Sequence, residues 1–197
     1  MAEIKEFESS DNTDISILIK NNKEYTKNLI NLIQPEIYIT FKSMYDDIKN
    51  SSSTQSGILI PFQNSVAKIP QWTDEIITKK IEDLKTSSDC EWLEDLIEAV
   101  FSTNSKIVKE IEGSDNLEIP TINTFIHSLY IDVAREFWKN PFLVYDVDVK
   151  QSKIKRNLIE SYDIIEECIE TYISDNILSR EKLTEYIENN NINLSDS

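Results

Sequence analysis

The sequence predicts an all-α protein, folded as a compact bundle of about six or seven helices. Two observations favour this class. The chain of 197 residues contains only 2 glycines and 5 prolines, whereas strands joined by tight turns need glycine where φ is positive. Apolar residues also recur every three or four positions along most of the chain, which is the period of an amphipathic helix.

The N-terminal region divides into a tail and a helical segment. Residues 1–12 are acidic and carry little apolar surface, so we expect them to be disordered. A helical pattern of apolar residues begins at Thr13. Pro35 interrupts this pattern and suits the first turn of a second helix. The region up to residue 49 therefore predicts two helices that meet near Pro35.

The next region contains the one exception to the helical pattern. Residues 50–57 are polar and predict a linker. Residues 58–70 are apolar but are broken by Pro61 and Pro70, and they predict an extended segment laid over the helices. Such a strip would serve either as core cover or as an exposed docking strap.

Capping residues predict the following two helices. Thr73 suits an N-cap, with acidic residues in the first turn after it. Ser88 and Glu91 have the spacing of a capping box, which would open a second helix with Trp92 on its apolar face. Gly113 then suits the C-terminal stop of that helix.

The stretch FIHSLYIDVAREFWKNPFLVYD predicts a central helix that ends before Asn140-Pro141, because a residue before proline avoids the α region. At ~100° per residue, its apolar positions form a face wider than a coiled-coil seam. Burial of this face would contribute on the order of 10 kcal/mol before entropy is counted. The core positions that we predict here are Phe125, Leu129, Val133, Phe137 and Trp138.

The C-terminal region predicts more helix. FLVYDVDV alternates and suits an extended segment, and 152–173 predicts a long helix with a shorter one near 180–188. Residues 189–197 form a polar tail that we expect to be loose. The chain then comprises a single helical domain over 13–188, between the disordered N-terminus and this tail.

The charge of the chain limits its partners. Acidic residues outnumber basic ones by 36 to 20, for a net charge of −16. This charge repels phosphate backbones and anionic lipid, so we expect no nucleic acid partner. No apolar run approaches the ~18 residues of a membrane span. The charge suits instead a partner with a basic surface. Cys90 and Cys168 form no disulfide framework, which favours a reducing compartment.

One set of side chains in the central helix raises the question of catalysis. His127 is the only histidine, and Asp132 and Glu136 form a carboxylate pair four residues apart. Paired carboxylates can hold a metal in a helical bundle, but the known arrangement needs Glu-x-x-His motifs, which the chain lacks. We therefore favour a structural histidine and a partly solvated flank. A metal enzyme built on these three residues stays open as a third hypothesis.

Glu136 has a second, structural interpretation. Its helical position falls beside Phe125 and Leu129, and a buried carboxylate needs a partner. Arg156, in the basic run 150–156, is the candidate, and an Arg–Glu clamp would fix two helices across the turn at residues 140 and 141. We favour this clamp over a functional site. The chain has no nucleotide-binding, zinc-protease or serine-hydrolase motif, so we predict no enzyme, no catalytic residue, no metal and no cofactor.

Three stretches carry a resemblance to a known family. They are IPQWTDEII with CEWLEDLIEAVF, then FIHSLYIDVAREFWKNPFLVYD, then IIEECIETYISDNILSREKLTEYI. These stretches resemble an uncharacterised protein family of nucleocytoplasmic large DNA viruses, the giant viruses. The likeness covers roughly residues 35 to 188 and is densest at AREFWKNPF. It implies a viral protein that is made and used in the host cytoplasm, and it implies no activity. The C-terminal stretch departs from the family by being more acidic.

Two functional hypotheses follow. The first is a non-enzymatic viral structural or assembly protein, such as a minor capsid or scaffold component of the virion, which docks to other viral proteins through shape and charge. The alternative is a soluble helical-bundle regulator that binds a host or viral helix in an apolar groove. The first would place the protein in the virion and in the viral factory of the host cytoplasm. The oligomeric state is not predicted.

Overall fold

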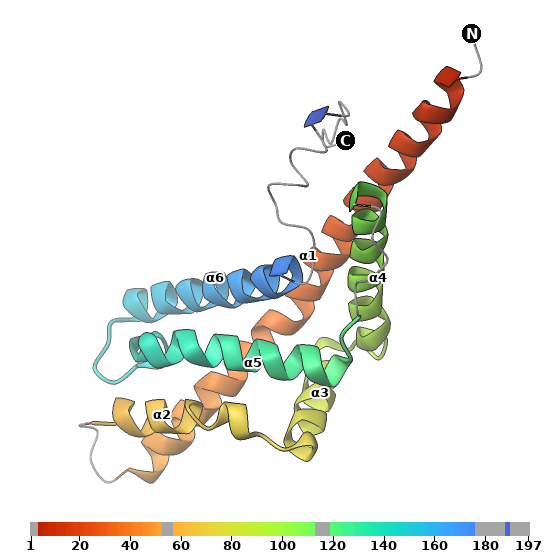
Figure 1. Cartoon of the computed structure of the whole chain (residues 1–197). Coiled ribbons are helices and arrows are strands. Elements are labelled where there is room, and N and C mark those ends of the chain that lie inside the picture. Colours follow the sequence, from red (N-terminus) through yellow and green to blue (C-terminus); the bar gives the residue numbers. More distant parts are fainter. Residues whose placement is uncertain (1–3, 53–56, 113–118, 176–187, 190–197) are drawn as a thin grey trace. The chain divides into compact units, whose positions relative to one another are not determined.

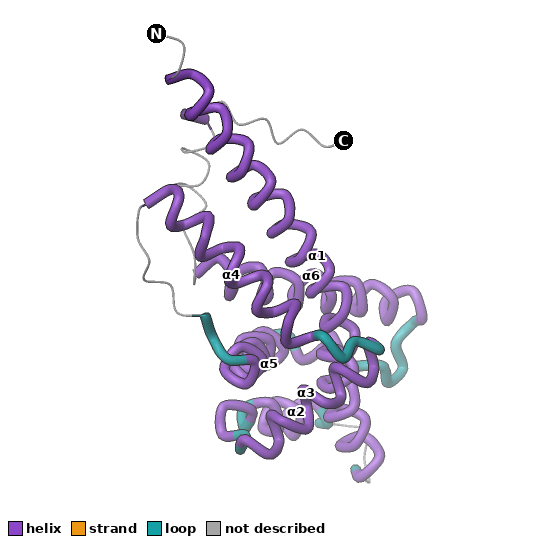
Figure 2. The backbone as a smooth tube through the Cα atoms, turned by 90° about the vertical axis from the view of Figure 1, so that its right-hand side faces the viewer, coloured by secondary structure: helices purple, strands orange, loops and turns teal. Residues whose placement is uncertain are grey.

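The computed structural model describes residues 4–52, 57–112, 119–175 and 188–189. Six α-helices and two short 3-10 helices occupy these residues, and no strand occurs among them (Figure 2). The all-α class predicted from glycine scarcity and helical periodicity is confirmed. The elements in order are α1 (Ile4–Ser51), α2 (Leu59–Val66), η1 (Ile69–Gln71), α3 (Asp74–Ser88), α4 (Leu93–Glu112), α5 (Ile122–Lys139), η2 (Pro141–Val144) and α6 (Gln151–Asp175).

The contacts of the chain group into two compact units. The first unit takes in the described residues of 1–29, 93–120 and 170–197, and the second unit takes in those of 30–92 and 121–169. Helices α1 and α6 each contribute residues to both units. The single domain that we expected over 13–188 stays a prediction. None of the helices in the described ranges combines the length and the hydropathy that crossing a bilayer requires.

Helix α1 differs from the expectation at two places, its first residues and Pro35. It begins at Ile4, so residues 4–12, which we expected to be disordered, are helical, while residues 1–3 lie outside the described part. It also continues through Pro35, so the two predicted helices are one. A proline inside a helix removes one backbone hydrogen bond and costs about 3 kcal/mol. Apolar burial on both sides of the proline offsets this cost, because Ile33 and Ile37 are fully buried.

The segment 58–70 is helical, which corrects the expected extended strip. It forms α2 and then η1. Pro61 is the third residue of α2, where a missing N–H removes no intrahelical hydrogen bond. Phe62 and Val66 from α2 and Ile69 from η1 are fully buried. The prolines therefore start these helices instead of preventing them, and one face of the segment is core.

Of the two caps predicted for α3 and α4, one has the predicted position and the other is wrong. Thr73 occupies the N-cap position of α3, but its side chain makes no capping hydrogen bond. Ser88 is the last residue of α3 and its hydroxyl donates to the Leu84 carbonyl oxygen at 2.6 Å, so it caps no following helix. Asp89 is the C-cap of α3 with a φ of 50°, in the left-handed region, and α4 begins at Leu93. The predicted stop at Gly113 lies outside the described residues.

Helix α5 begins and ends where the sequence predicts. The hydroxyl of the N-cap Thr121 accepts from the Thr124 N–H at 3.2 Å, and the helix ends at Lys139, with Asn140 as its C-cap before Pro141. Of residues 142–149, which we expected to be extended, the first three belong to η2 (Pro141–Val144). Helix α6 covers the predicted 152–173. The shorter helix expected near 180–188 and the tail of 189–197 fall almost wholly outside the described residues.

The first unit holds its own small apolar cluster. Ile15 and Ile19 from α1 pack with Ile107 from α4, and Leu18 and Ile111 pack against them. One polar contact joins the same two helices, because the Asn22 side-chain amide donates to the Val100 carbonyl oxygen at 3.0 Å.

The second unit is built around α5, which lies beside α2 and packs against α3 and η1 (Figure 1). Aromatic side chains join α1 to α5 and to α2. The Phe41 ring stacks on Phe137 with centroids 4.7 Å apart, and Tyr45 meets Phe62 edge to face at 6.1 Å. Such pairs contribute about 0.5–1.5 kcal/mol beyond the area that they bury. The core of the second unit is therefore an aromatic layer between α1, α2 and α5.

Candidate docking site

The apolar face of α5 is core over most of its length. Phe125, Leu129, Val133 and Phe137 are each 0% exposed, as predicted. Trp138 is 50% exposed, so its assignment to the core is corrected. A residue that follows Phe137 lies about 100° further round the helix. This step moves the indole out of the core and onto the surface between α5 and the end of α2.

The three residues considered for catalysis do not converge on one point. The His127 ring nitrogen Nε2 lies 3.1 Å from the Ile69 carbonyl oxygen, in a contact between α5 and η1. Asp132 accepts from Arg135 at 2.5 Å. Glu136 accepts from Lys139 at 2.7 Å. In the described residues, no group of three or more histidine, cysteine or carboxylate side chains is arranged to hold a metal ion.

The predicted clamp between Glu136 and Arg156 is replaced by a pair inside α5. The Glu136 carboxylate takes Lys139 as its partner one turn along the same helix. Arg156 lies on the exposed side of α6. Glu136 is half-buried and close enough to the α6 residue Cys168 to act on it electrostatically, but its hydrogen bond stays within α5.

The Cys168 thiol is held in its unreactive, protonated form. Burial, together with the negative charges of Asp132 and Glu136, raises its pKa to about 12. Only the thiolate is a strong nucleophile, and a raised pKa removes it at neutral pH. His127, Asp132 and Glu136 are thus engaged in structural contacts, and Cys168 is held in an unreactive form.

An apolar groove opens at the surface where α2 and η1 meet α5. Its volume is about 310 Å³, at the small end of the ~300–1,000 Å³ that ligand pockets span. The apolar residues that line it are Val66, Ala67, Pro70, Ile131, Ala134 and Trp138.

Two polar contacts hold the walls of this groove in place. The Gln63 side-chain amide of α2 donates to the Trp138 carbonyl oxygen at 2.8 Å. The contact of His127 with the Ile69 carbonyl oxygen fixes η1 against α5. These contacts therefore hold α2 and η1 against α5, so the groove is preformed.

The charged residues that line the groove are both basic. They are Arg135 and Lys139, whose side chains are 67% and 61% exposed. Each is paired with the carboxylate three residues before it on α5. Ion pairs this exposed contribute only about 0–1 kcal/mol. The rim of the groove therefore carries two exposed and adaptable basic side chains, in a chain whose net charge is −16.

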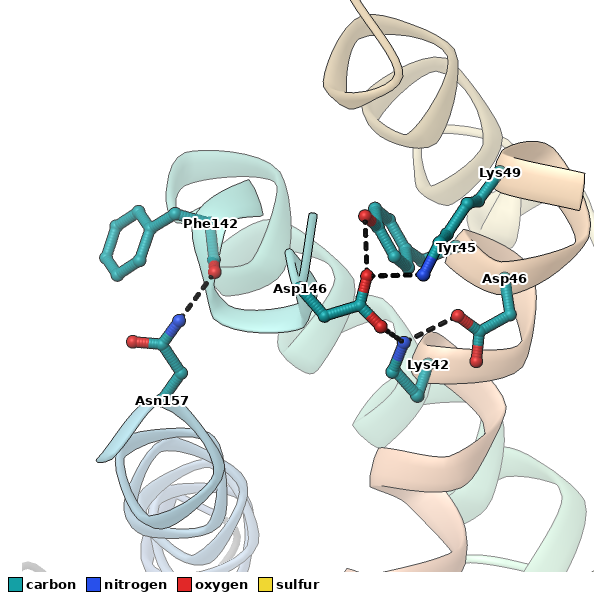
Figure 3. Close-up of polar contacts among 7 residues, drawn as sticks. All are labelled: Lys42, Tyr45, Asp46, Lys49, Phe142, Asp146 and Asn157. Atoms are coloured by element: carbon teal, nitrogen blue, oxygen red, sulfur yellow. Dashed lines mark hydrogen bonds and ion pairs between the residues drawn. The ribbon is translucent and has the colours of Figure 1, made fainter. Parts of the chain in front are cut away.

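A cluster of polar side chains stabilises the second unit, which carries the groove. We call it the Asp146 cluster, and it comprises Asp146 with Lys42, Tyr45 and Lys49 of α1 (Figure 3). The carboxylate accepts from Lys49 at 2.7 Å, from Lys42 at 2.9 Å and from the Tyr45 hydroxyl at 3.2 Å. The cluster fixes the segment between η2 and α6 onto α1.

Two opposing effects act on the Asp146 carboxyl. Partial burial on its own would raise its pKa, but hydrogen bonds from Lys49 and Lys42 and their positive charges outweigh burial. The pKa of Asp146 is therefore held below its ordinary value. Burial raises the pKa of Tyr45. Both groups keep their ordinary charge at neutral pH, which is what a structural cluster requires.

Sequence reasoning missed the Asp146 cluster, although a signal existed. Lys42, Tyr45 and Lys49 are spaced by three and four, which places them on one helical face. Sequence reasoning also missed the basic rim. It noted the apolar segment 58–70 as a docking strip or core cover, and the structure makes it partly core and partly the wall of the groove.

Comparison with known proteins identifies a family for this chain but assigns no activity to it. A model described as a family of unknown function (DUF5764) matches residues 15–145. A search of the curated proteins and a search of the solved structures each found no match. The matched residues run from Ile15 of α1 to Tyr145, which directly follows η2, and so include both walls of the groove. This match covers well over half of the chain, and the protein belongs to this family of unknown function, DUF5764.

Proposed function

We propose that this protein is a non-enzymatic structural or assembly protein of a virus, such as a minor capsid or scaffold component, and that it acts by docking to other proteins. The observation that carries the docking role is the apolar groove with the half-exposed Trp138 at its edge. The viral setting is supported by the resemblance of residues 35 to 188 to a giant-virus family. The setting implied is the virion and the viral factory in the host cytoplasm.

Docking would use two surfaces of different character. The groove offers apolar area whose burial contributes about 25 cal/mol per Å². The remaining surface is strongly acidic and would meet viral proteins that have basic surfaces, by charge complementarity. The buried aromatic layer beneath α5 gives a stiff body, so docking loses little conformational entropy.

Quantitative proteomics of purified virus particles tests this proposal. A particle component would be present in a fixed ratio to the major structural proteins from one preparation to the next. A non-structural viral protein known to be excluded from particles provides the control for contamination. Absence of the chain from particles, or a level that falls with each purification step as the control does, overturns the structural role.

The alternative is a regulator that binds a host or viral helix in the groove without entering the particle. The groove itself favours this candidate, because apolar grooves between helices accept amphipathic helices in other proteins. The two candidates separate in infected cells. The regulator would form a complex with its target in the cytoplasm while particles lack it, whereas the structural protein would be packaged.

A further inference from the structure

We propose that the groove between α2, η1 and α5 binds one amphipathic α-helix of a partner protein, with apolar side chains of that helix in the groove and its carboxylates on Arg135 and Lys139. This inference rests on the docking function proposed above and names the chemistry of the partner. The argument uses the shape of the groove, the kind of polar group in it and the sign of its charges.

The lining of the groove suits a helix better than a small molecule. Small-molecule sites place a few polar groups among apolar walls to fix the orientation of the ligand. Here the polar lining consists of two long, exposed basic side chains, Arg135 and Lys139, at the rim. An apolar floor between two helices with charges along one side matches an occupant that presents anchors at positions i, i+3 or i+4, and i+7.

The volume of the groove limits how many apolar side chains of the guest helix can enter it. About 310 Å³ accommodates a few apolar side chains and no more. The two bases are four residues apart on α5, which is about one helical turn or ~6 Å along its axis. A guest helix that lies along α5 therefore meets both bases with carboxylates that are also about one turn apart.

The charge of the basic side chains at the rim of the groove determines which guest helices are attracted. The acidic partners of the two bases, Asp132 and Glu136, lie near Cys168 of α6, since their charges raise the pKa of that thiol. The charge of Lys139 also reaches that thiol, but among these four side chains only Arg135 and Lys139 line the groove. At physiological salt, charges beyond ~8 Å are largely screened. The local bases, and not the net charge of −16, then decide which helix is attracted.

A guest need not break the existing ion pairs. An arginine offers five N–H donors and a lysine three, and the structure assigns one donor atom of each to its neighbour on α5. The remaining donors are available to carboxylates of the guest. The bases can therefore bridge α5 and the guest helix at the same time.

A displayed library of helical peptides tests the proposal with the full chain as the target. Every peptide carries leucine at the i, i+3 and i+7 anchors, and its flanking positions encode glutamate or lysine with equal frequency. We expect glutamate-flanked peptides to be enriched about tenfold over lysine-flanked ones, as two partly exposed charge pairs would give. Enrichment of lysine-flanked peptides, no charge preference or no enrichment of any peptide would each overturn the proposal.

Three variants locate the binding. The double variant Arg135→Glu with Lys139→Glu reverses the rim and should reverse the preference to lysine-flanked peptides. Its matched control is Lys155→Glu with Arg156→Glu, which makes the same change in net charge on the exposed side of α6 and should leave the preference unchanged. Ala67→Phe fills the groove from an exposed position and should abolish enrichment. Binding that survives Ala67→Phe places the peptide elsewhere and overturns the proposal.

Two further measurements complete the test. Far-UV circular dichroism and thermal unfolding of each variant show that it folds, and these residues are exposed or at the rim, so we expect little change. Sedimentation velocity asks whether the occupant is a second copy of the chain. A wild-type dimer that Ala67→Phe dissociates would overturn the heterologous partner. Presence of the chain in particles is measured separately, so a failed peptide selection leaves the structural role standing.

Discussion

Replacing Asp146 with asparagine tests how much the Asp146 cluster stabilises the body that carries the groove. The carboxylate accepts from two lysines of α1, at 2.7 Å from Lys49 and 2.9 Å from Lys42. Asparagine keeps the shape of the side chain but removes its negative charge. The lysines then lose their shared counter-ion, and the segment after η2 loses its main attachment to α1.

The expected loss follows from the exposure of the cluster. A hydrogen bond to a charged group contributes about 1.5–3 kcal/mol when buried, whereas an exposed ion pair contributes about 0.2–1 kcal/mol. The Asp146 side chain is 22% exposed, which lies between these limits. Two such contacts predict a loss of about 2 kcal/mol in the free energy of unfolding for Asp146→Asn. For a chain of this size, this lowers the midpoint of thermal unfolding by about 4–8 °C.

Thermal and urea unfolding at pH 7, followed by far-UV circular dichroism, measure this loss. Asp148→Asn is the matched control, because Asp148 is exposed and the substitution makes the same change in charge. Asparagine also tolerates the positive φ of 54° at this position. The control should lose less than about 0.5 kcal/mol. An Asp146→Asn loss as small as that of the control would refute the reasoning.

The pH dependence of the same pair of proteins gives a second check. The pKa of Asp146 is lower in the folded protein than its ordinary value of 3.8. Its carboxylate therefore stabilises the fold above that ordinary value, and the stabilisation disappears as pH falls through the folded value. The difference in unfolding free energy between the wild type and Asp146→Asn should be constant near pH 7 and should shrink below pH ~4. A difference that is unchanged at low pH would contradict the assignment.

Three further predictions concern α5 and its neighbours. Phe137→Ala should lower the free energy of unfolding by about 3–5 kcal/mol, because the ring is fully buried and stacked on Phe41. Trp138→Ala should lower it by less than about 1.5 kcal/mol, since the indole is half-exposed. Urea unfolding compares the two variants, and equal losses would contradict the corrected core. The Cys168 thiol should react with iodoacetamide at least about 100-fold more slowly in the native protein than in urea, as its raised pKa requires, and mass spectrometry of the labelled peptide measures this. Purified protein treated with a chelator should keep its midpoint of thermal unfolding, since His127 is engaged with a backbone carbonyl; a bound metal and a lower midpoint would revive the enzyme hypothesis.

Helix α5 shows what the sequence could predict. Its broad apolar face, its start after Pro120 and its end before Pro141 all follow from local rules, and the structure agrees with each. Only Trp138 was misassigned, because the predicted apolar band was drawn too wide. The all-α class could equally be predicted from the sequence, since 2 glycines leave few positions for tight turns.

Proline caused the main errors in the fold. Local rules end a helix at Pro35, yet α1 continues because buried isoleucines on either side hold it, and sequence alone does not weigh that tertiary burial. The same rules made 58–70 extended, although Pro61 falls in the first turn of α2, where proline is compatible with a helix. The error lay in the position of the helix start and not in the chemistry of proline.

The candidate site was less predictable than the fold. A groove between α2 and α5 depends on which helices become neighbours, and a single sequence does not specify this. The same limit explains the clamp, where Glu136 found Lys139 one turn away instead of Arg156 on another helix. Residues one turn apart on a helix are always close, whereas a pair between helices requires the correct packing.

Site-specific cross-linking at Trp138 tests the central claim, that this groove is a docking surface, most directly. Under the proposed viral role, the indole is replaced by benzoylphenylalanine in the chain expressed during infection, and purified particles are irradiated. Ile159 on α6 is the control position, because it is 53% exposed and is not part of the groove lining. The account predicts cross-links from position 138 to one other particle protein, through a segment of helical spacing, and few from position 159. Equal cross-linking from both positions, or none from position 138, would contradict it.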